Sequence, residues 1–178
     1  MKLSLEKILV DTSRAIANIA ISEVERNPAL YEEAWELVAR DKYPISMRAV
    51  RIVDECAEKN PLLIEPFLDE IILLLPEFKV DGVKRGLLRF FVNSKFRLTA
   101  NQRGRLVEVC FEFLMAAGSS IAIRYYSLAI LYNISKKEKS LKPELLDAIE
   151  EGILRNRFTH SSIYKYRNKL YKEIQSGR

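Results

Sequence analysis

The chain has 178 residues, a net charge of +5 and 48% hydrophobic residues. This composition is typical of a globular protein and excludes a largely disordered one. The longest apolar run, Ile71 to Leu75, is too short to cross a membrane, and the N-terminal residues lack a signal-peptide core. We therefore expect a single domain over residues 1–178, cytoplasmic and without a membrane partner.

The pattern of apolar residues predicts helices throughout the chain. Apolar residues recur at spacings of three and four, and only six glycines interrupt them. The expected helices, in chain order, cover residues 5–10, 13–26, 28–41, 44–58, 61–75, 81–92, 99–117, 120–135, 143–154 and 160–175.

Local signals predict where several of these helices begin. Ser4, Asp81 and Thr159 are N-cap candidates, and residues 99–102 (Thr-Ala-Asn-Gln) form a capping box. Asn27 and Asn60 each precede a proline, which predicts an N-cap followed by a proline at the first helical position. Pro66 lies one turn further on and should tighten or bend its helix.

Two helices carry patterns that predict their place in the core. Ile16, Ile19, Ala20 and Val24 form the expected core-facing stripe of the helix over residues 13–26. The helix over residues 120–135 is apolar nearly all round, which predicts a central, buried element. Cys56 and Cys110 lie inside apolar patterns, so we expect two buried, reduced thiols.

A tetrapeptide reveals an internal repeat. Residues 25–28 (Glu-Arg-Asn-Pro) return as residues 58–61 (Glu-Lys-Asn-Pro), 33 positions later, and residues 12–40 align with residues 45–73 at this offset. A second mark recurs near the start of every even-numbered helix, where a basic residue follows an apolar or small one: Ser13-Arg14, Met47-Arg48, Val83-Lys84, Ile123-Arg124 and Tyr164-Lys165.

In these features the chain resembles the HEAT/armadillo superfamily of helical repeats, in which an apolar-Arg pair often opens the second helix of a unit. The resemblance implies an all-α, right-handed α-α superhelix of about five antiparallel helix pairs. The pairs would cover residues 3–26, 28–59, 61–94, 99–136 and 141–175. It also implies a concave surface lined by the second helices and a role as scaffold or adaptor.

Basic residues on the expected second helices are the candidate binding residues. If they face one way, they form a positive ladder suited to an acidic partner; alternatively, the leading arginines brace the turns between helices, for instance against Asp41 or Asp81. The ladder consists of Arg48, Arg51, Lys84, Arg85, Arg89, Arg124, Lys165 and Lys169.

The C-terminal segment concentrates positive charge. Residues 155–178 sum to +6, whereas the first 154 residues sum to −1. Basic residues alternate there with tyrosines, a combination that can hold phosphates and stack bases. A terminal capping helix has the same composition, with Ile163, Tyr166, Leu170 and Ile174 as its core-facing stripe.

The sequence offers no catalytic constellation. The single histidine, His160, lies in the first turn of the last helix, and no nucleophile, phosphate-loop or metal-ligand motif is present. Adjacent acidic residues such as Asp54 and Glu55 point about 100° apart on a helix, so we interpret them as parts of solvated faces. We expect no enzyme activity, no cofactor and no metal.

The leading hypothesis is a non-enzymatic scaffold that binds a protein or peptide through the concave surface. The alternative is nucleic-acid binding through a basic concave face and the basic-aromatic C-terminal helix, with a HEAT-like DNA-repair glycosylase as its most distant form. A nucleic-acid binder requires one continuous positive face, whereas an adaptor presents mixed charge with exposed apolar residues.

Overall fold

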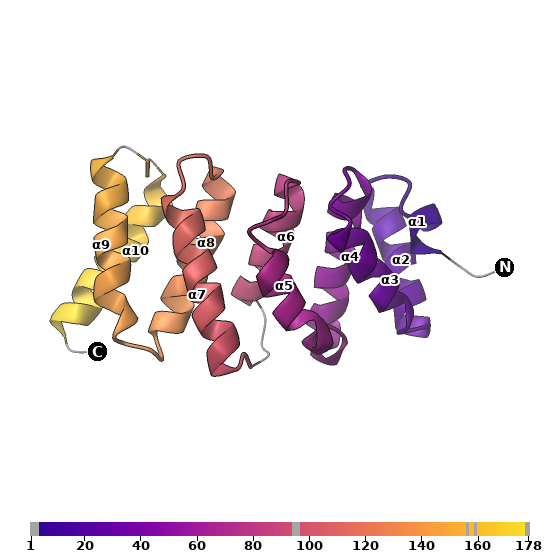
Figure 1. Ribbon diagram of the computed structural model, residues 1–178, viewed down its shortest axis with the longest axis horizontal. Helices are drawn as coiled ribbons and strands as arrows, with labels where there is room; N and C mark the ends of the chain where they lie inside the picture. Colours follow the sequence, from indigo (N-terminus) through magenta and orange to yellow (C-terminus); the bar gives the residue numbers. More distant parts are fainter. Residues whose placement is uncertain (1–3, 94–96, 156, 159, 177–178) are drawn as a thin grey trace. The chain divides into compact units, whose positions relative to one another are not determined.

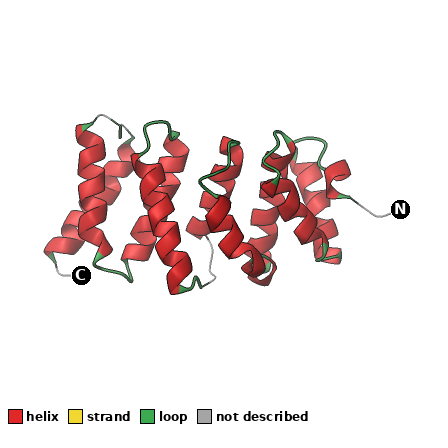
Figure 2. Cartoon of the chain, in the orientation of Figure 1, coloured by secondary structure: helices red, strands yellow, loops and turns green. Residues whose placement is uncertain are grey.

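The computed structural model describes residues 4–93, 97–155, 157–158 and 160–176, which form helices and connecting turns without a strand (Figure 2). The expected all-α class is therefore confirmed. The chain divides into two compact units, the N-terminal unit (residues 1–98) and the C-terminal unit (residues 99–178). Among the described residues, no helix has both the length and the apolar character needed to span a membrane.

The N-terminal unit is built around one helix (Figure 1). Helix α4 packs against α2, α3 and α6, and its Ile52 and Val53 are completely or almost completely buried. The elements are α1 (Leu5–Ile8), α2 (Arg14–Arg26), α3 (Leu30–Ala39), α4 (Ile45–Lys59), the 3₁₀ turns η1 (Pro61–Leu63) and η2 (Glu65–Phe67), α5 (Leu68–Leu74) and α6 (Asp81–Asn93).

The two Asn-Pro pairs have nearly the same backbone. Asn27 ends α2 and Asn60 ends α4, with φ/ψ of −136°/87° and −137°/90°. Asn60 precedes η1 without a side-chain capping bond, and α3 begins three residues after Asn27, so the predicted side-chain caps are wrong at both positions. Pro66 lies in η2, so the predicted tightening there is confirmed. The carbonyl of Asn27, not its side chain, receives the N–H of Leu30 at 3.0 Å.

The start of α1 is stabilised from a distance rather than by its own cap. Ser4 occupies the N-cap position without a side-chain capping bond, which contradicts the expected role. Its hydroxyl donates to Glu33 Oε1 of α3 at 2.8 Å, and the N–H of Leu5 donates to the same oxygen at 2.8 Å. A carboxylate from another helix therefore satisfies the first donor of α1.

The expected core stripe of α2 is shifted. Ile19 is 50% exposed, and the buried face consists of Ala17, Ala20, Ile21 and Val24. Helix α2 packs against α4, and its buried face combines two alanines with the larger Ile21 and Val24. Hydrophobicity alone favoured the larger Ile19.

The C-terminal unit consists of two helix pairs, α7 (Ala100–Met115) with α8 (Ile121–Ser135) and α9 (Leu141–Leu154) with α10 (Ser161–Gln175). Figure 1 shows the partners of each pair side by side. The capping box is confirmed. The Thr99 hydroxyl accepts the backbone N–H of Gln102 at 3.2 Å, and the Gln102 side-chain oxygen accepts the backbone N–H of Thr99 at 3.0 Å. Helix α8 supplies much of the core, although Ile121 at its start is 60% exposed.

Two helix starts of this unit differ from the expectation. Helix α9 begins at Leu141, two residues before Pro143, which its first turn tolerates because no helical N–H bond is lost there. The predicted cap Thr159 lies outside the described residues. The N-cap of α10 is His160, whose Nδ1 accepts the N–H of Ser162 at 3.3 Å.

Both cysteines are free and buried. Burial raises the pKa of the Cys56 thiol to about 12 and also raises the pKa of Cys110. These thiols therefore pack as small apolar groups, as the sequence predicts.

Candidate functional site

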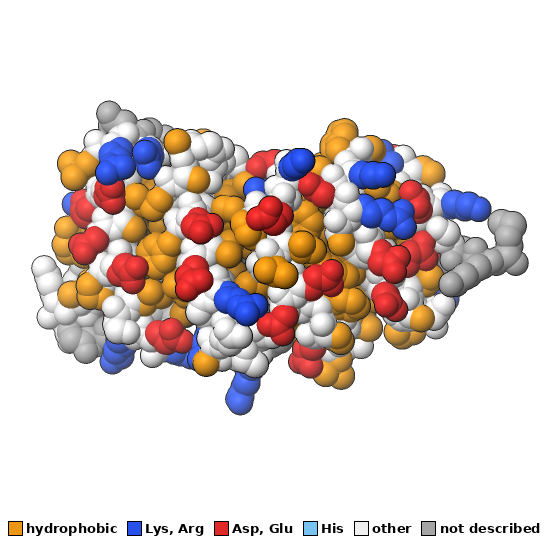
Figure 3. Space-filling view, viewed as in Figure 1, with side chains coloured by type: hydrophobic (Ala, Val, Ile, Leu, Met, Phe, Trp, Pro, Cys, Tyr) orange, Lys and Arg blue, Asp and Glu red, His pale blue; other side chains and the backbone are white. Residues whose placement is uncertain are grey.

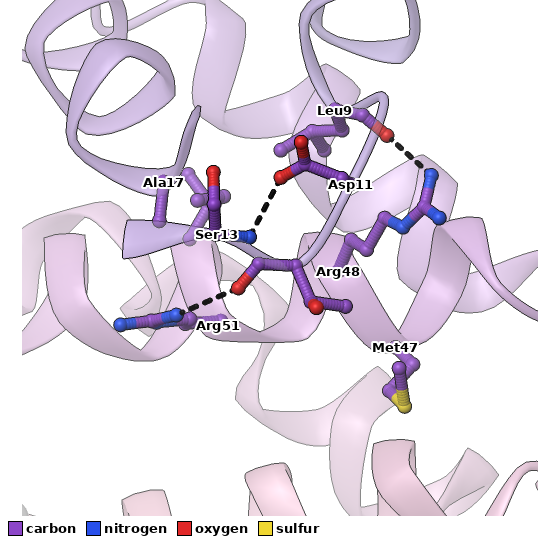
Figure 4. Close-up of a pocket in the computed structure, with 9 residues that line it drawn as sticks. Leu9, Asp11, Ser13, Ala17, Met47, Arg48 and Arg51 are labelled. Atoms are coloured by element: carbon purple, nitrogen blue, oxygen red, sulfur yellow. Dashed lines mark hydrogen bonds between the residues drawn. The ribbon is translucent and has the colours of Figure 1, made fainter. Parts of the chain in front are cut away.

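The first two residues of the basic ladder hold the α1–α2 connection against α4. Arg48 donates to the carbonyl of Leu9 at 2.8 Å, and Arg51 donates to the carbonyl of Thr12 at 3.4 Å (Figure 4). Arg51 also donates to Glu55 at 2.8 Å. Both guanidinium groups are thus engaged within the N-terminal unit.

These arginines border a cleft of about 210 Å³ in the N-terminal unit (Figure 4). Its rim also carries Asp11, whose carboxylate accepts the N–H of Ser13 at 2.7 Å. The hydrogen bonds from Ser13, with a smaller contribution from Arg48, hold the pKa of Asp11 below its usual value. An anion entering this cleft would meet an ionised carboxylate and two arginines that already have acceptors.

The three ladder residues of α6 also have partners. Lys84 donates to the carbonyl of Pro76 at 3.1 Å, Arg85 lies 3.5 Å from Asp81, and Arg89 pairs with Asp54 of α4. Bracing of the turns is therefore observed in this unit for Arg48, Arg51 and Lys84, whereas the pair of Asp81 with Arg85 is an i, i+4 pair within α6.

Asp41, the other expected bracing partner, has a different role. Its two carboxylate oxygens accept the backbone N–H groups of Lys79 at 2.6 Å and Val80 at 3.1 Å. Asp41 has a positive φ of 49°, a conformation that aspartate tolerates better than most residues. The α3–α4 turn is thereby tied to the residues that precede α6.

Asp54 lies in the core, contrary to the expectation drawn from the sequence. It is 1% exposed rather than part of a solvated face. Burial raises the pKa of its carboxyl to about 6, and this effect exceeds the lowering by the Arg89 guanidinium. Its Oδ1 is buried without a hydrogen-bond partner. One signal was available: Val50, Asp54 and Ala57 share one face of α4 at spacings of four and three.

The leading arginine of the C-terminal unit is a brace as well. Arg124 donates to the carbonyls of Ala116 at 2.8 Å, Ala117 at 3.0 Å and Arg157 at 3.3 Å. Arg157 in turn donates to the carbonyl of Met115 at 2.7 Å. The two loops at this end of the unit are therefore joined through guanidinium groups.

The last two ladder residues lie in a different environment. Lys165 and Lys169 line a cleft of about 220 Å³ together with Tyr125, Ser162 and Tyr166. We call the wider surface the Tyr–Lys groove. It consists of Tyr125 and Tyr132 from α8, Lys136 at the C-terminal end of α8, and Ser162, Lys165, Tyr166 and Lys169 from α10.

Aromatic and cation–π contacts hold the groove together. The ring centroids of Tyr132 and Tyr166 lie 5.1 Å apart in an edge-on arrangement. The ammonium of Lys169 lies 5.7 Å from the Tyr132 centroid and 5.9 Å from that of Tyr166, and Lys136 lies 4.9 Å from Tyr132. Such contacts orient an ammonium without neutralising it.

Within the part of the chain that the structure describes, Lys165 and Lys169 form no ion pair. The one acidic residue of α10, Glu173, is bonded to Lys142 at 2.7 Å and to the Tyr132 hydroxyl at 2.6 Å. These two bonds, first that of Lys142, lower the pKa of Glu173. The groove therefore keeps its positive charge.

Charge is segregated between the helices of the C-terminal unit. Helices α8 and α10 contain five basic residues and one acidic residue, whereas α7 and α9 contain three basic and six acidic residues. Figure 3 shows the face over α7 and α9, on which acidic side chains are spread along both helices. The acidic residues of these two helices are Glu108, Glu112, Glu144, Asp147, Glu150 and Glu151.

The sequence indicated the two lysines and their alternation with tyrosines on α10, but not that Tyr125 and Tyr132 of α8 lie beside them. Of the expected core stripe, Ile163 and Leu170 are buried and Ile174 is 38% exposed. The missed signal was the coincidence of two spacings, seven residues between Tyr125 and Tyr132 and four between Lys165 and Lys169.

The comparison with protein families agrees with the repeat. A family model described as a HEAT repeat domain matches residues 5–174. No curated protein and no solved structure matches the chain.

Proposed function

Because the chain belongs to the HEAT repeat domain family, we propose that it is a non-enzymatic module that binds another protein. In this proposal the second helices of the C-terminal unit, α8 and α10, form the binding surface. The observation that carries it is the Tyr–Lys groove, where exposed lysines lie over tyrosine rings without an ion-pair partner among the described residues. Tyrosine is enriched in protein interfaces because it offers a large, rigid surface with one polar end.

The cysteines, Asp54 and His160 are the candidate nucleophiles and bases, and their surroundings favour binding over catalysis. A reactive thiolate requires a lowered pKa, whereas burial raises the pKa of both cysteines. Asp54 is enclosed beside Arg89, and His160 caps a helix. None of these groups lines the groove.

Nucleic acid is the competing partner, and two observations favour protein. The five ladder residues of the N-terminal unit contact carbonyl or carboxylate oxygens, so they do not extend a positive face. In the groove, Lys136 and Lys169 lie over the Tyr132 ring, which leaves less of that ring for stacking on a base.

Site-specific photo-cross-linking in the source cells tests the proposal. A photoreactive amino acid at Asn168, exposed on α10, should give a discrete adduct with one protein, and the same amino acid at Glu108, exposed on α7, should not. The purified partner should then bind the purified chain in solution. Equal adducts at both positions, or an adduct with nucleic acid only, would contradict the proposal.

A further inference from the structure

We propose that the Tyr–Lys groove binds an extended acidic segment of the partner protein, with Asp or Glu at alternate positions. This inference rests on the proposed function and specifies the chemistry of the segment. It concerns one row of lysines and the cleft beside it.

The row consists of three lysines on one face of α10. Lys165, Lys169 and Lys172 follow one another at spacings of four and three, and all three are exposed. With a helical rise of 1.5 Å per residue, Lys165 and Lys169 are about 6 Å apart along the axis of α10. Alternate side chains of an extended strand are separated by about 6.6 Å and point to the same side.

The two periods therefore coincide. An extended segment lying along α10 would place the acidic side chain of one residue opposite Lys165. The acidic side chain two residues further along the segment would then lie opposite Lys169. The intervening side chain would point away, so its identity matters little. A helical acidic segment would reach the same interval only with acidic residues four apart, whereas residues two apart on a helix point to opposite sides, so acidic residues at alternate positions specify the extended form.

The cleft beside the row has the size and donors for one carboxylate. Its volume of about 220 Å³ is smaller than the roughly 300 Å³ at which small-molecule pockets begin, so it suits a side chain better than a whole ligand. Lys165, Lys169 and Tyr125, whose side chains carry donor groups, line it, and so does Ser162, whose hydroxyl lies 2.7 Å from His160 Nδ1. A carboxylate can accept from several such donors at once.

The surroundings keep the lysines available for such a segment. Lys142 holds Glu173, so the nearest acidic side chain on α10 does not compete for them. The tyrosine rings restrict Lys169, and a side chain that is already restricted loses less entropy when it binds. The acidic residues of α7 and α9 would repel the same segment from the first helices.

Fluorescence anisotropy with the full chain tests the inference. The probe is a labelled peptide in which two glutamates alternate with glycines (Gly-Glu-Gly-Glu-Gly), and the comparison peptide has the same composition with the two glutamates adjacent, so that in an extended chain they point to opposite sides. We expect the alternating peptide to bind several-fold more tightly, since only it aligns two carboxylates with Lys165 and Lys169. A peptide with glutamine in place of glutamate should not bind.

Charge reversal locates the binding. Lys165→Glu/Lys169→Glu should weaken binding of the alternating peptide by about tenfold or more, as expected for the loss of two ion pairs and the addition of repulsion. The matched control is Arg105→Glu/Lys139→Glu, which changes the net charge equally at exposed positions of the same unit. This control should change binding by less than about twofold, because salt screens the interaction between the peptide and charges that it does not contact. Lys165→Gln/Lys169→Gln provides a milder variant, and thermal unfolding shows whether each variant is folded.

Three results would overturn the inference: equal binding of both peptides, equal losses in the two charge-reversal variants, or tighter binding of a single-stranded oligonucleotide of matched charge. If one of them is found while the Asn168 adduct persists, the acidic segment is wrong and protein binding stands. If the Asn168 adduct does not form in the chain without these lysine substitutions, the proposed function is contradicted instead.

Discussion

The two units place basic residues at equivalent positions on their second helices and use them differently. In the N-terminal unit, all five ladder residues contact carbonyl or carboxylate oxygens of their own unit. In the C-terminal unit, Arg124 follows the same rule, whereas Lys165 and Lys169 lie over or beside tyrosine rings. The difference shows that the position of a cation on a repeat does not determine its role, because the acceptors within reach decide it.

The comparison predicts that bracing cations and their partners affect folding, whereas groove lysines affect binding. The expected changes in the free energy of unfolding are largest for the buried Asp54 and for Arg124, smaller for Arg48 and smallest for the groove lysines.

Asp54→Asn should produce the largest change in the N-terminal unit. The pKa of Asp54 is raised from its ordinary 3.8 to about 6, so the folded chain holds this proton more tightly than the unfolded chain. The contribution of Asp54 to the free energy of unfolding is therefore most favourable below pH 4. It declines as the pH rises from 4 to 6 and stays constant above pH 6. The full loss is about 3 kcal/mol, at about 1.4 kcal/mol for each unit of pKa.

We expect Asp54→Asn to raise the free energy of unfolding at pH 7.5 by about 2 kcal/mol, somewhat less than the full amount because its bond to Arg89 is weaker without the charge. Urea unfolding from pH 4 to 8 measures the difference between the two chains. A difference that does not vary with pH would show that Asp54 is ionised in the folded chain throughout this range.

Arg124→Ala should destabilise the C-terminal unit by about 2 kcal/mol, because three carbonyls lose a charged donor and one loop contact is lost. Urea unfolding monitored by tyrosine fluorescence provides the measurement. Arg105→Ala, at an exposed position of α7 in the same unit, is the control and should cost less than about 0.5 kcal/mol. Similar losses in both variants would contradict the bracing role.

Arg48→Ala should cost about 1 kcal/mol, since a single carbonyl, that of Leu9, loses its charged donor. Hydrogen exchange should show the effect locally, as faster exchange of the α1 amides with little change in the C-terminal unit. Uniform acceleration throughout the chain would argue against a local brace.

Lys165→Met and Lys169→Met should change the free energy of unfolding by less than about 0.5 kcal/mol, because methionine retains an apolar stem against the rings and no ion pair is lost. The same variants should weaken binding of the acidic peptide. A loss of stability comparable to that of Arg124→Ala would show that these lysines stabilise the fold rather than bind a partner.

Features set by neighbours in sequence could be predicted. The capping box at Thr99 and the tightened turns at Pro66 depend on a few adjacent residues, and both occur as expected. The repeat likewise indicated the family, because an offset of 33 residues is visible without coordinates.

Features set by distant residues could not be predicted. The acceptor of Arg48 lies 39 positions away at Leu9, and the carboxylate that caps α1 comes from Glu33. Asp54 and Glu55 look alike in the sequence, yet packing against α6 buries the first and leaves the second half-buried. The groove required knowing that α8 and α10 lie together.

The bonds from Asp41 to Lys79 and Val80 have a consequence for how this repeat can vary in evolution. Both N–H donors belong to consecutive residues, and both must meet one carboxylate fixed by a turn 38 and 39 positions earlier. An insertion or deletion between Leu75 and Lys79 would move both donors together, so this connection has a fixed length. Homologous chains should accumulate length changes in other loops and keep this one constant.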